Sequence, residues 1–301
     1  MNTLNRRALI VCTLAIKEAG ESDQFSPADF DLKVAVDGGA QWFRERDITP
    51  DLAVGDFDSA TTETLAWLES TQVEIQRVSS DKTYSDLELA LTLCEEQQIQ
   101  SATILGALGG RVDHQLCVLG ALLRSSVPEL TLQGAGQTIR LLRAGDSLSL
   151  KATPEGSPHA DNVHPLSNLH SNNNSHSDNS PCAGDTGASK TFSVISLQGA
   201  TVSITGARWP LDQVTLEPLS SLGLSNECND PAIVSTEDLS TAQPAAASLE
   251  MTGGADTAKI INNTKTTECN DTLTADTTIT LSAGSAFVIA SDLTYTMRHG
   301  V

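Results

Sequence analysis

Basic residues are few in this chain of 301 residues, in which 18 lysines and arginines stand against 38 aspartates and glutamates. The formal net charge of −20 gives a surface that repels the phosphates of nucleic acids. We therefore expect no nucleic-acid partner. A small phosphate ligand is compatible with this charge, because a local basic group or a bound metal ion can reverse the sign of a pocket.

The six cysteines include no pair at the C-x-x-C spacing of zinc and redox sites. Cys94 and Cys117 lie at apolar positions of predicted helices, where we interpret them as small core residues. A reduced protein of the cytoplasm is the simplest account of this cysteine usage.

Long apolar runs are missing as well, and no stretch is long enough to span a membrane. The run at residues 8–16 follows Arg6 and Arg7 and so imitates a signal peptide. Lys17 and Glu18 close it, however, and no small-x-small cleavage site follows promptly. We therefore predict a first buried strand there, and no membrane partner.

Strands and helices alternate through the first part of the chain. The pattern predicts strands at residues 8–16, 32–36, 51–54, 73–78 and 102–105, and helices at 40–46, 61–71, 86–98 and 113–124. Such alternation is typical of an α/β domain with a mostly parallel sheet. We place this domain at residues 1–132.

Short strands without strong helices follow and predict an all-β domain at residues 133–301, a sandwich or a barrel, with the sandwich preferred. The strands are expected at 130–132, 138–142, 147–150, 192–197, 201–204, 278–281 and 286–289. Two long stretches, at about 151–190 and 228–276, are rich in Ser, Asn, Thr and Ala. They hold too little apolar surface to offset the entropy of ordering them, so we expect two flexible insertions.

Two carboxylates stand two residues apart after the apolar run at residues 52–54. Side chains at i and i+2 of an extended strand point to one face, so Asp56 and Asp58 can present acceptor oxygens to one point. Hard cations such as Mg²⁺ take ligands of this kind. The alternative is that Gly55, Asp56 and Ser59 are ordinary residues of a strand-ending turn.

Two further acidic segments adjoin neighbouring predicted strands, and loops at the carboxyl ends of parallel strands line the ligand crevice. Asp37 ends one strand and precedes two glycines, which permit close approach by a ligand. Asp81, Lys82 and Asp86 cluster where a helix begins, at a capping box made by Ser85 and Glu88. The alternative role of Asp86 is to complement the helix dipole.

A glycine-rich turn at residues 106–110 leads from a predicted strand into a helix. Free backbone N–H groups at such a helix start attract anions, and Arg111 adds a planar fork suited to phosphate. The turn matches neither the Walker nor the Rossmann pattern and is weak evidence when taken alone. His114 can be a ligand-binding or a structural residue. Together the four segments suit a Mg²⁺-assisted transfer of a phosphoryl-type group.

The segments also resemble one known family, thiamine pyrophosphokinase. The motifs that carry the resemblance are D-G-G-A at 37–40, T-P-D at 49–51, G-D-F-D-S at 55–59, D-K-T-x-S-D-L-E at 81–88 and G-G-R-x-D-H at 109–114. Residues 206–211 and 223–227 resemble two signatures of the family's β-domain. The resemblance implies transfer of a pyrophosphoryl group from ATP to thiamine, with release of AMP, in a homodimer whose site lies at the subunit interface.

The resemblance also implies roles for individual residues. The expected catalytic residues are Asp56, Asp58, Asp81, Asp86 and Arg111, of which Asp56, Asp58 and Asp86 are the expected Mg²⁺ ligands. The residues expected to bind ATP or thiamine are Asp37, Gly38, Gly39, Lys82, Thr83, Gly110, Asp113, His114, Ser225 and Asn226. Trp209 belongs to a signature but is equally well explained as a core residue of the β-domain.

The chain departs from the family's pattern in its first loop, where residues 12–15 (Cys-Thr-Leu-Ala) stand in place of a small glycine-containing loop near the nucleotide, so that contact is not expected to be the family's usual one. No departure removes a carboxylate or Arg111, so an active enzyme is expected. Two rival functions stay open. One is a Mg²⁺-dependent nucleotide or pyrophosphate hydrolase, and the other is a sensor that binds thiamine or nucleotide without catalysis.

Overall fold

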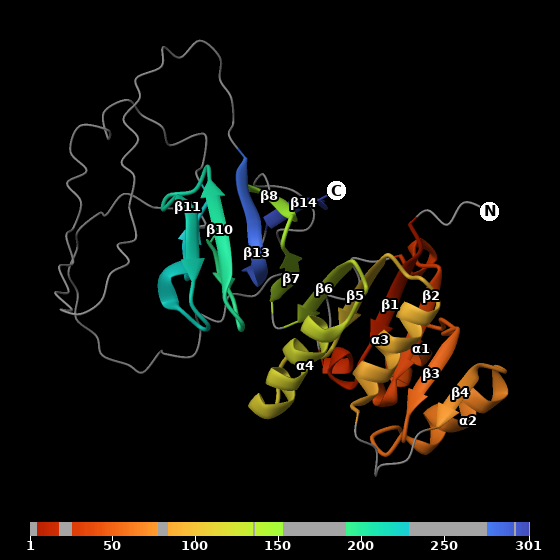
Figure 1. Cartoon of the computed structure of the whole chain (residues 1–301). Coiled ribbons are helices and arrows are strands. Elements are labelled where there is room, and N and C mark those ends of the chain that lie inside the picture. Colours follow the sequence, from red (N-terminus) through yellow and green to blue (C-terminus); the bar gives the residue numbers. More distant parts are fainter. Residues whose placement is uncertain are drawn as a thin grey trace, which may run out of the picture. The chain divides into compact units, whose positions relative to one another are not determined.

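The computed structural model describes residues 5–17, 26–77, 84–134, 136–152, 191–228, 276–291 and 293–300. They form two compact units, which divide between Leu141 and Leu142 (Figure 1). The sequence pattern placed this division at 132/133. The two expected insertions lie almost entirely outside the described residues.

The first unit is built on a mostly parallel sheet, which confirms the predicted α/β class. Its strands are β1 (Arg7–Val11), β2 (Leu32–Val36), β3 (Leu52–Gly55), β4 (Glu74–Arg77), β5 (Ser101–Leu105), β6 (Glu129–Gly134) and β7 (Gln137–Arg143). The order across the sheet is β7-β6-β5-β1-β2-β3-β4. All neighbours are parallel except β6 and β7. The strand expected at 130–132 is therefore part of this sheet.

Four helices accompany the sheet: α1 (Ala40–Glu45), α2 (Thr62–Ser70), α3 (Asp86–Glu96) and α4 (Val112–Arg124). Three short 3-10 turns are η1 (Thr13–Lys17), η3 (Pro27–Asp29) and η4 (Asp37–Gly39). The four-residue spacings of α3 place Leu87, Ala90, Leu91 and Cys94 on its buried stripe. Helix α4 differs, because its first turns face solvent and Cys117 is exposed. The interpretation of Cys117 as a core residue is therefore wrong, whereas that of Cys94 is confirmed.

The middle of the sheet is buried on both faces, which is why its strands are continuous apolar runs rather than alternating ones. All four residues from Ala8 to Val11 in β1 are fully buried. Trp42 and Phe43 of α1 and Leu68 of α2 pack into the same core. Burial of such side chains contributes roughly 1.5–3 kcal/mol each, so this core fixes the sheet edge on which the acidic loops lie.

The first strand is shorter than predicted, because the chain turns into η1 after Val11. Cys12 N donates to Leu105 O at 2.8 Å and Leu14 N donates to Gly106 O at 3.1 Å. Gly106 has φ 69°, and a Cβ there would overlap the backbone of Ala15. The apolar run 8–16 thus packs partly as a turn against the loop after β5.

The described residues of the second unit form seven further strands, all paired antiparallel. They are β8 (Ser147–Ala152), β9 (Thr191–Ile195), β10 (Ala200–Thr205), β11 (Leu211–Leu216), β12 (Asn226–Glu227), β13 (Thr277–Ala290) and β14 (Leu293–Arg298). The sequence pattern missed β11, β12 and β14, and it split β13 into two strands. Residues 282–285, between the two expected strands, belong to the same extended strand, with Gly284 at φ 74° beside a register shift against β10.

Strand β13 connects β8, β9 and β10, because it pairs with all three. Its first half pairs with β8 and β10, and its second half pairs with β9. A core of aliphatic side chains and Phe192 lies between these strands. Among the described residues, no helix is long and apolar enough to cross a membrane.

Candidate metal and phosphate site

Three carboxylates meet where β2 and β3 end. One oxygen from each of Asp37, Asp56 and Asp58 lies within 4.8 Å of the other two. Because β2 and β3 are parallel neighbours, the loops that follow them leave the sheet at the same edge. The group is the acidic cluster of the first unit, and it joins a residue after β2 to the pair after β3.

The backbone of the acidic cluster is a turn rather than an extended strand. Strand β3 ends at Gly55. Phe57, which stands between the two aspartates in the sequence, has a left-handed φ of 60° and a buried side chain. Asp58 N donates to Asp56 Oδ1 at 3.2 Å. The expected extended-strand geometry of the pair is therefore wrong, and it is the turn that brings the two carboxylates together.

Asp37 is the most constrained member of the acidic cluster. It has a left-handed φ of 49°, which is uncommon for a residue other than glycine. Its Oδ2 accepts a hydrogen bond from the Ser59 hydroxyl. Its Oδ1 is buried and has no hydrogen-bond partner among the described residues. A buried carboxylate oxygen without a partner is costly, and a bound cation would satisfy it.

The charges in the acidic cluster act on one another. The pKa of Asp58 is raised, first by the charge of Asp56 and then by that of Asp37, with smaller contributions from burial and from Asp86. Like charges this close favour the protonated form. A divalent cation would reverse this balance, and an all-oxygen donor set is what Mg²⁺ prefers. The residues present therefore fit Mg²⁺.

Asp86 is the first residue of α3 and does not belong to the close trio of the acidic cluster. Its charge nevertheless reaches that neighbourhood, because it contributes to the raised pKa of Asp58. The same charge acts on Cys12, whose pKa is raised to about 12 by burial first and then by Asp86 and Asp37. Asp86 is thus near enough to the trio for its charge to act on Asp58.

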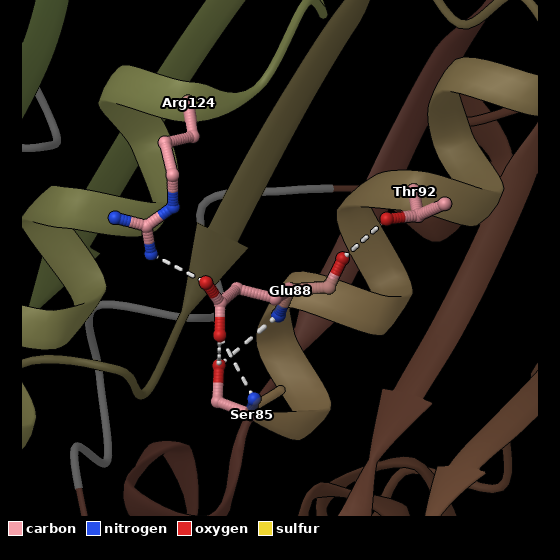
Figure 2. Close-up of polar contacts among 4 residues, drawn as sticks. All are labelled: Ser85, Glu88, Thr92 and Arg124. Carbon is pink, nitrogen blue, oxygen red and sulfur yellow. Dashed lines mark hydrogen bonds and ion pairs between the residues drawn. The ribbon is translucent and has the colours of Figure 1, made fainter. Parts of the chain in front are cut away.

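The start of α3 is held by the predicted capping box. Glu88 N donates to Ser85 Oγ at 3.3 Å, and Ser85 N donates to Glu88 Oε2 at 2.8 Å. Figure 2 shows that the other oxygen of Glu88 accepts from the guanidinium of Arg124, at the end of α4. The turn that presents Asp86 is therefore anchored both locally and to a second helix.

The glycine-rich turn after β5 leads into α4 as predicted. Gly109 and Gly110 have φ of 95° and 70°, a region that favours glycine. Arg111 is the N-cap residue of α4 and its side chain makes no cap, so it leaves the N–H groups of Val112 and Asp113 to an anion. His114 is exposed, and its N donates to Asp113 Oδ1 at 3.0 Å.

Arg111 and Asp113 form an exposed ion pair on this turn. Arg111 Nε donates to Asp113 Oδ1 at 3.0 Å, and the guanidinium also reaches Oδ2. The hydrogen bond and the charge of Asp113 raise the pKa of Arg111, and the hydrogen bond from Arg111 is the first cause of the lowered pKa of Asp113. The guanidinium is thus always charged and presents a fork of the shape that phosphate oxygens accept.

Three of the predicted site residues, Asp81, Lys82 and Thr83, lie outside the described residues. Two other residues were missed by sequence reasoning: Ser59 and Thr13 both contact the acidic cluster or its neighbours. Ser59 directly follows the aspartate pair, which was a usable signal. Thr13 lies in the first loop, which departs from the family's pattern, but no pattern in the sequence predicts that this loop reaches the one after β3.

In the second unit, the two signature segments pair with each other. Asn226 is buried, and its side chain binds Trp209 through its backbone N and O, at 3.1 and 2.7 Å. Trp209 is half exposed, with the guanidinium of Arg208 4.7 Å from its ring centroid. The core interpretation of Trp209 is therefore wrong. Ser225 is exposed with a left-handed φ of 54°, and its N donates to Ser193 Oγ at 3.0 Å.

The fold and the acidic cluster define a class of protein: a parallel α/β unit with a carboxylate site at the carboxyl edge of its sheet, followed by an antiparallel β unit. Two family models match the chain, "Thiamin pyrophosphokinase, catalytic domain" at residues 27–133 and "Thiamin pyrophosphokinase, vitamin B1 binding domain" at residues 182–239. The chain belongs to the thiamin pyrophosphokinase family.

Curated relatives agree with this assignment. The chain is 35% identical over 85 residues to the thiamine pyrophosphokinase of Bacillus subtilis, a match covering 28% of this chain and 40% of that protein. It is 24% identical over 195 residues to thiamine pyrophosphokinase 1 of Oryza sativa, which covers 63% of each. The chain therefore spans less than two thirds of the length of these relatives.

Solved structures show the same fold over most of the chain. The thiamine pyrophosphokinase of Bacillus subtilis aligns with a TM-score of 0.61 at 18% identity and covers 95% of this chain and 99% of that one. The thiamin pyrophosphokinase of Candida albicans aligns with a TM-score of 0.60 at 16% identity, covering 96% and 90%. The family's fold is thus retained at low sequence identity.

Proposed function

We propose that this protein transfers a pyrophosphoryl group from ATP to thiamine, giving thiamine diphosphate and AMP, in a Mg²⁺-dependent reaction. The observation that carries the proposal is the acidic cluster, in which Asp37, Asp56 and Asp58 converge and one Asp37 oxygen is buried without a partner among the described residues. Membership of the family supports the substrates.

Asp56 and Asp58 are the best candidates to hold Mg²⁺, with Asp37 beside them and Asp86 approaching from α3. When bound, Mg²⁺ neutralises phosphate oxygens and so lowers the cost of bringing a polyanion to an acidic surface. Gly38 and Gly39 let the chain pass close to the ligand. Gly39 is also needed for packing, because a Cβ there would overlap the carbonyl of Val11.

The basic side chains and the start of α4 bind the phosphate groups of the nucleotide. Arg111, with Gly110 and the first N–H groups of α4, binds phosphate oxygens, and the ion pair with Asp113 keeps the guanidinium oriented until then. Lys82 and Thr83 act beside Asp81 on the same phosphates, as the family motif implies. His114 adds a donor at the start of α4.

The chemistry is an in-line attack of the thiamine hydroxyl oxygen on the β-phosphorus of ATP, with AMP leaving. One carboxylate accepts the hydroxyl proton, and Asp56, Asp58, Asp81 and Asp86 are the candidates. We further propose that Ser225 and Asn226 serve thiamine binding. Asn226 does so indirectly, because its side chain holds the backbone of the half-exposed Trp209.

We propose that residues 1–132 form the catalytic domain, that 133–301 form a thiamine-binding sandwich, and that the active form is a cytoplasmic homodimer with the site at the subunit interface. The thiols of Cys12, Cys94 and Cys117 are free, which suits a reducing compartment. Light scattering after size exclusion tests the dimer. A monomer that is fully active would refute it.

One experiment separates the proposal from its rivals. The protein is supplied with ATP, Mg²⁺ and thiamine, and both AMP and thiamine diphosphate are measured. A pyrophosphokinase releases the two products in equal amounts and only with thiamine present. A hydrolase releases AMP without thiamine, and a sensor releases none.

Asp58→Asn should remove most of this turnover while the fold stays intact. Asp47→Asn is the matched control, because Asp47 is an exposed aspartate outside the acidic cluster, and its left-handed φ of 54° suits Asn equally well. Near-normal AMP release by Asp58→Asn would contradict the proposed function.

A further inference from the structure

The Ser59 hydroxyl stands at the centre of a small hydrogen-bond network beside the acidic cluster. It donates to Asp37 Oδ2, lies 3.1 Å from Gly38 N, and lies 3.4 Å from Thr13 Oγ1. A hydroxyl has one proton and two acceptor lone pairs. Since that proton goes to Asp37, and Gly38 N–H is itself a donor, Thr13 must donate to Ser59. The order of donation is therefore Thr13 to Ser59 to Asp37.

The network ties together three segments that are distant in sequence. Thr13 follows β1, Gly38 lies in the turn after β2, and Ser59 lies in the loop after β3. The fit is tight at Gly38, where an added Cβ would lie 2.8 Å from both Ser59 Oγ and Thr13 Cγ2. Glycine at this position thus lets the two hydroxyls close around the start of η4.

The network engages one of the two oxygens of Asp37 and leaves the other without a donor among the described residues. Oδ2 is used by Ser59, and Oδ1 remains buried without a partner among the described residues. Three carboxylates within 4.8 Å repel one another, so an unrestrained Asp37 would turn toward solvent. A donated hydrogen bond opposes this, because bonds to charged groups are the stronger ones.

We propose that Ser59 and Thr13 are positioning residues that hold Asp37 in the geometry for binding a divalent cation. This inference rests on the proposed function. It gives a role to the first loop, in which Thr13 stands where the family's pattern has a small glycine-containing loop. The threonine hydroxyl acts on Asp37 through Ser59 and is not itself a ligand of the cation.

Binding of Mn²⁺ to the nucleotide-free protein tests the proposal, with free Mn²⁺ followed by its electron paramagnetic resonance signal and Mg²⁺ competition as a check. Ser59→Ala should weaken Mn²⁺ binding about tenfold, the size expected for one hydrogen bond to a charged group. Thr13→Val should weaken it about threefold, because its 3.4 Å contact is longer and acts through Ser59. Thr13→Ser retains the hydroxyl and should bind as the parent does.

A double variant supplies the decisive comparison. Once Ser59→Ala has cut the network, adding Thr13→Val should change Mn²⁺ affinity no further, because coupled residues are not additive. Equal melting temperatures of the metal-free proteins would show that the effect is on positioning rather than on folding. If Ser59→Ala does not fold, the Thr13→Val and Thr13→Ser pair decides alone.

Two results would overturn the inference, and they differ. Unchanged Mn²⁺ affinity in Ser59→Ala and Thr13→Val, with the parent protein binding normally, removes the positioning role and leaves the proposed function standing. A parent protein that binds neither Mn²⁺ nor Mg²⁺, with or without ATP, removes the proposed function and the inference together.

Discussion

The carboxylate of Glu88 is shared between the first turn of α3 and the last residue of α4. Oε2 accepts from Ser85 N and from Ser85 Oγ, while Oε1 accepts from Arg124 (Figure 2). The pKa of Glu88 is lowered: partial burial acts to raise it, but the Ser85 N–H and the Arg124 guanidinium outweigh burial. Glu88 thus links the helix start that carries Asp86 to the neighbouring helix.

Replacing Arg124 with Gln should lower the free energy of unfolding by up to about 1 kcal/mol, a small value because the Arg124 side chain is 65% exposed. A lowered pKa means that Glu88 contributes stability above its unfolded pKa of about 4.3, and that this contribution is lost as the pH falls through the folded pKa. The difference between parent and variant, measured by urea denaturation, should therefore vanish at acidic pH.

The control is Arg44→Gln, which breaks the pair between α1 and the first turn of α2, where Glu63 is 83% exposed. Arg44→Gln should lower the free energy of unfolding less, because the cap of α2 is made by Thr61 and not by Glu63, whereas Glu88 belongs to the capping box of α3. A larger loss in Arg44→Gln than in Arg124→Gln, or a loss in Arg124→Gln that persists at low pH, would contradict the role given to Glu88.

Asp58→Asn should raise the melting temperature of the metal-free protein slightly. The pKa of Asp58 is raised in the folded state, so its contribution to stability is fully present below the unfolded pKa. That contribution is lost as the pH rises through the folded pKa. Removing the charge therefore relieves repulsion at neutral pH. Mg²⁺ should raise the melting temperature of the parent but not that of the variant, and equal Mg²⁺ shifts in both would contradict the metal site.

The sequence predicted the parallel sheet and its order of helices because buried parallel strands are apolar throughout and their helices are amphipathic. It also located the capping box of α3, which depends only on Ser85 and Glu88. It also predicted that Asp37 lies at the same crevice as the pair after β3, because both follow parallel strands. It could not show that Thr13 approaches Ser59, because that contact depends on how the loops after β1 and β3 turn. The exposed Cys117 was misread for a similar reason: α4 carries apolar residues on a face that the first unit does not cover.

Two glycine substitutions should have opposite outcomes. Gly39→Ala should abolish the soluble fold or cost several kcal/mol, because the new Cβ would overlap the carbonyl of Val11 in the core strand β1. Gly120→Ala should change stability by no more than about 1 kcal/mol, because alanine favours the interior of α4 and its Cβ would require only a small shift of the Arg124 guanidinium, at 3.1 Å. Expression and thermal unfolding check both, and a soluble, stable Gly39→Ala protein would contradict the packing at η4.

The cysteines of the first unit should differ sharply in reactivity. Cys117 is exposed, whereas Cys12 and Cys94 are buried and their pKa values are raised to about 12, in both cases chiefly by burial. At pH 8 a maleimide should therefore label Cys117 within minutes and leave the other two unmodified until urea is added. Peptide mass spectrometry locates the labels. Rapid labelling of Cys12 in the native protein would contradict the closed loop after β1.

Strand β13 has a consequence for the order in which the chain is completed during synthesis. Residues 277–290 pair with β8, β9 and β10, strands that leave the ribosome much earlier. These strands have no shared partner until the final part of the chain emerges, so their apolar faces depend on chaperones or transient contacts until then. The first unit's strands β1 to β6 need no later segment to pair. Ribosome stalling before residue 277 should thus leave the second unit protease-sensitive while the first already resists digestion.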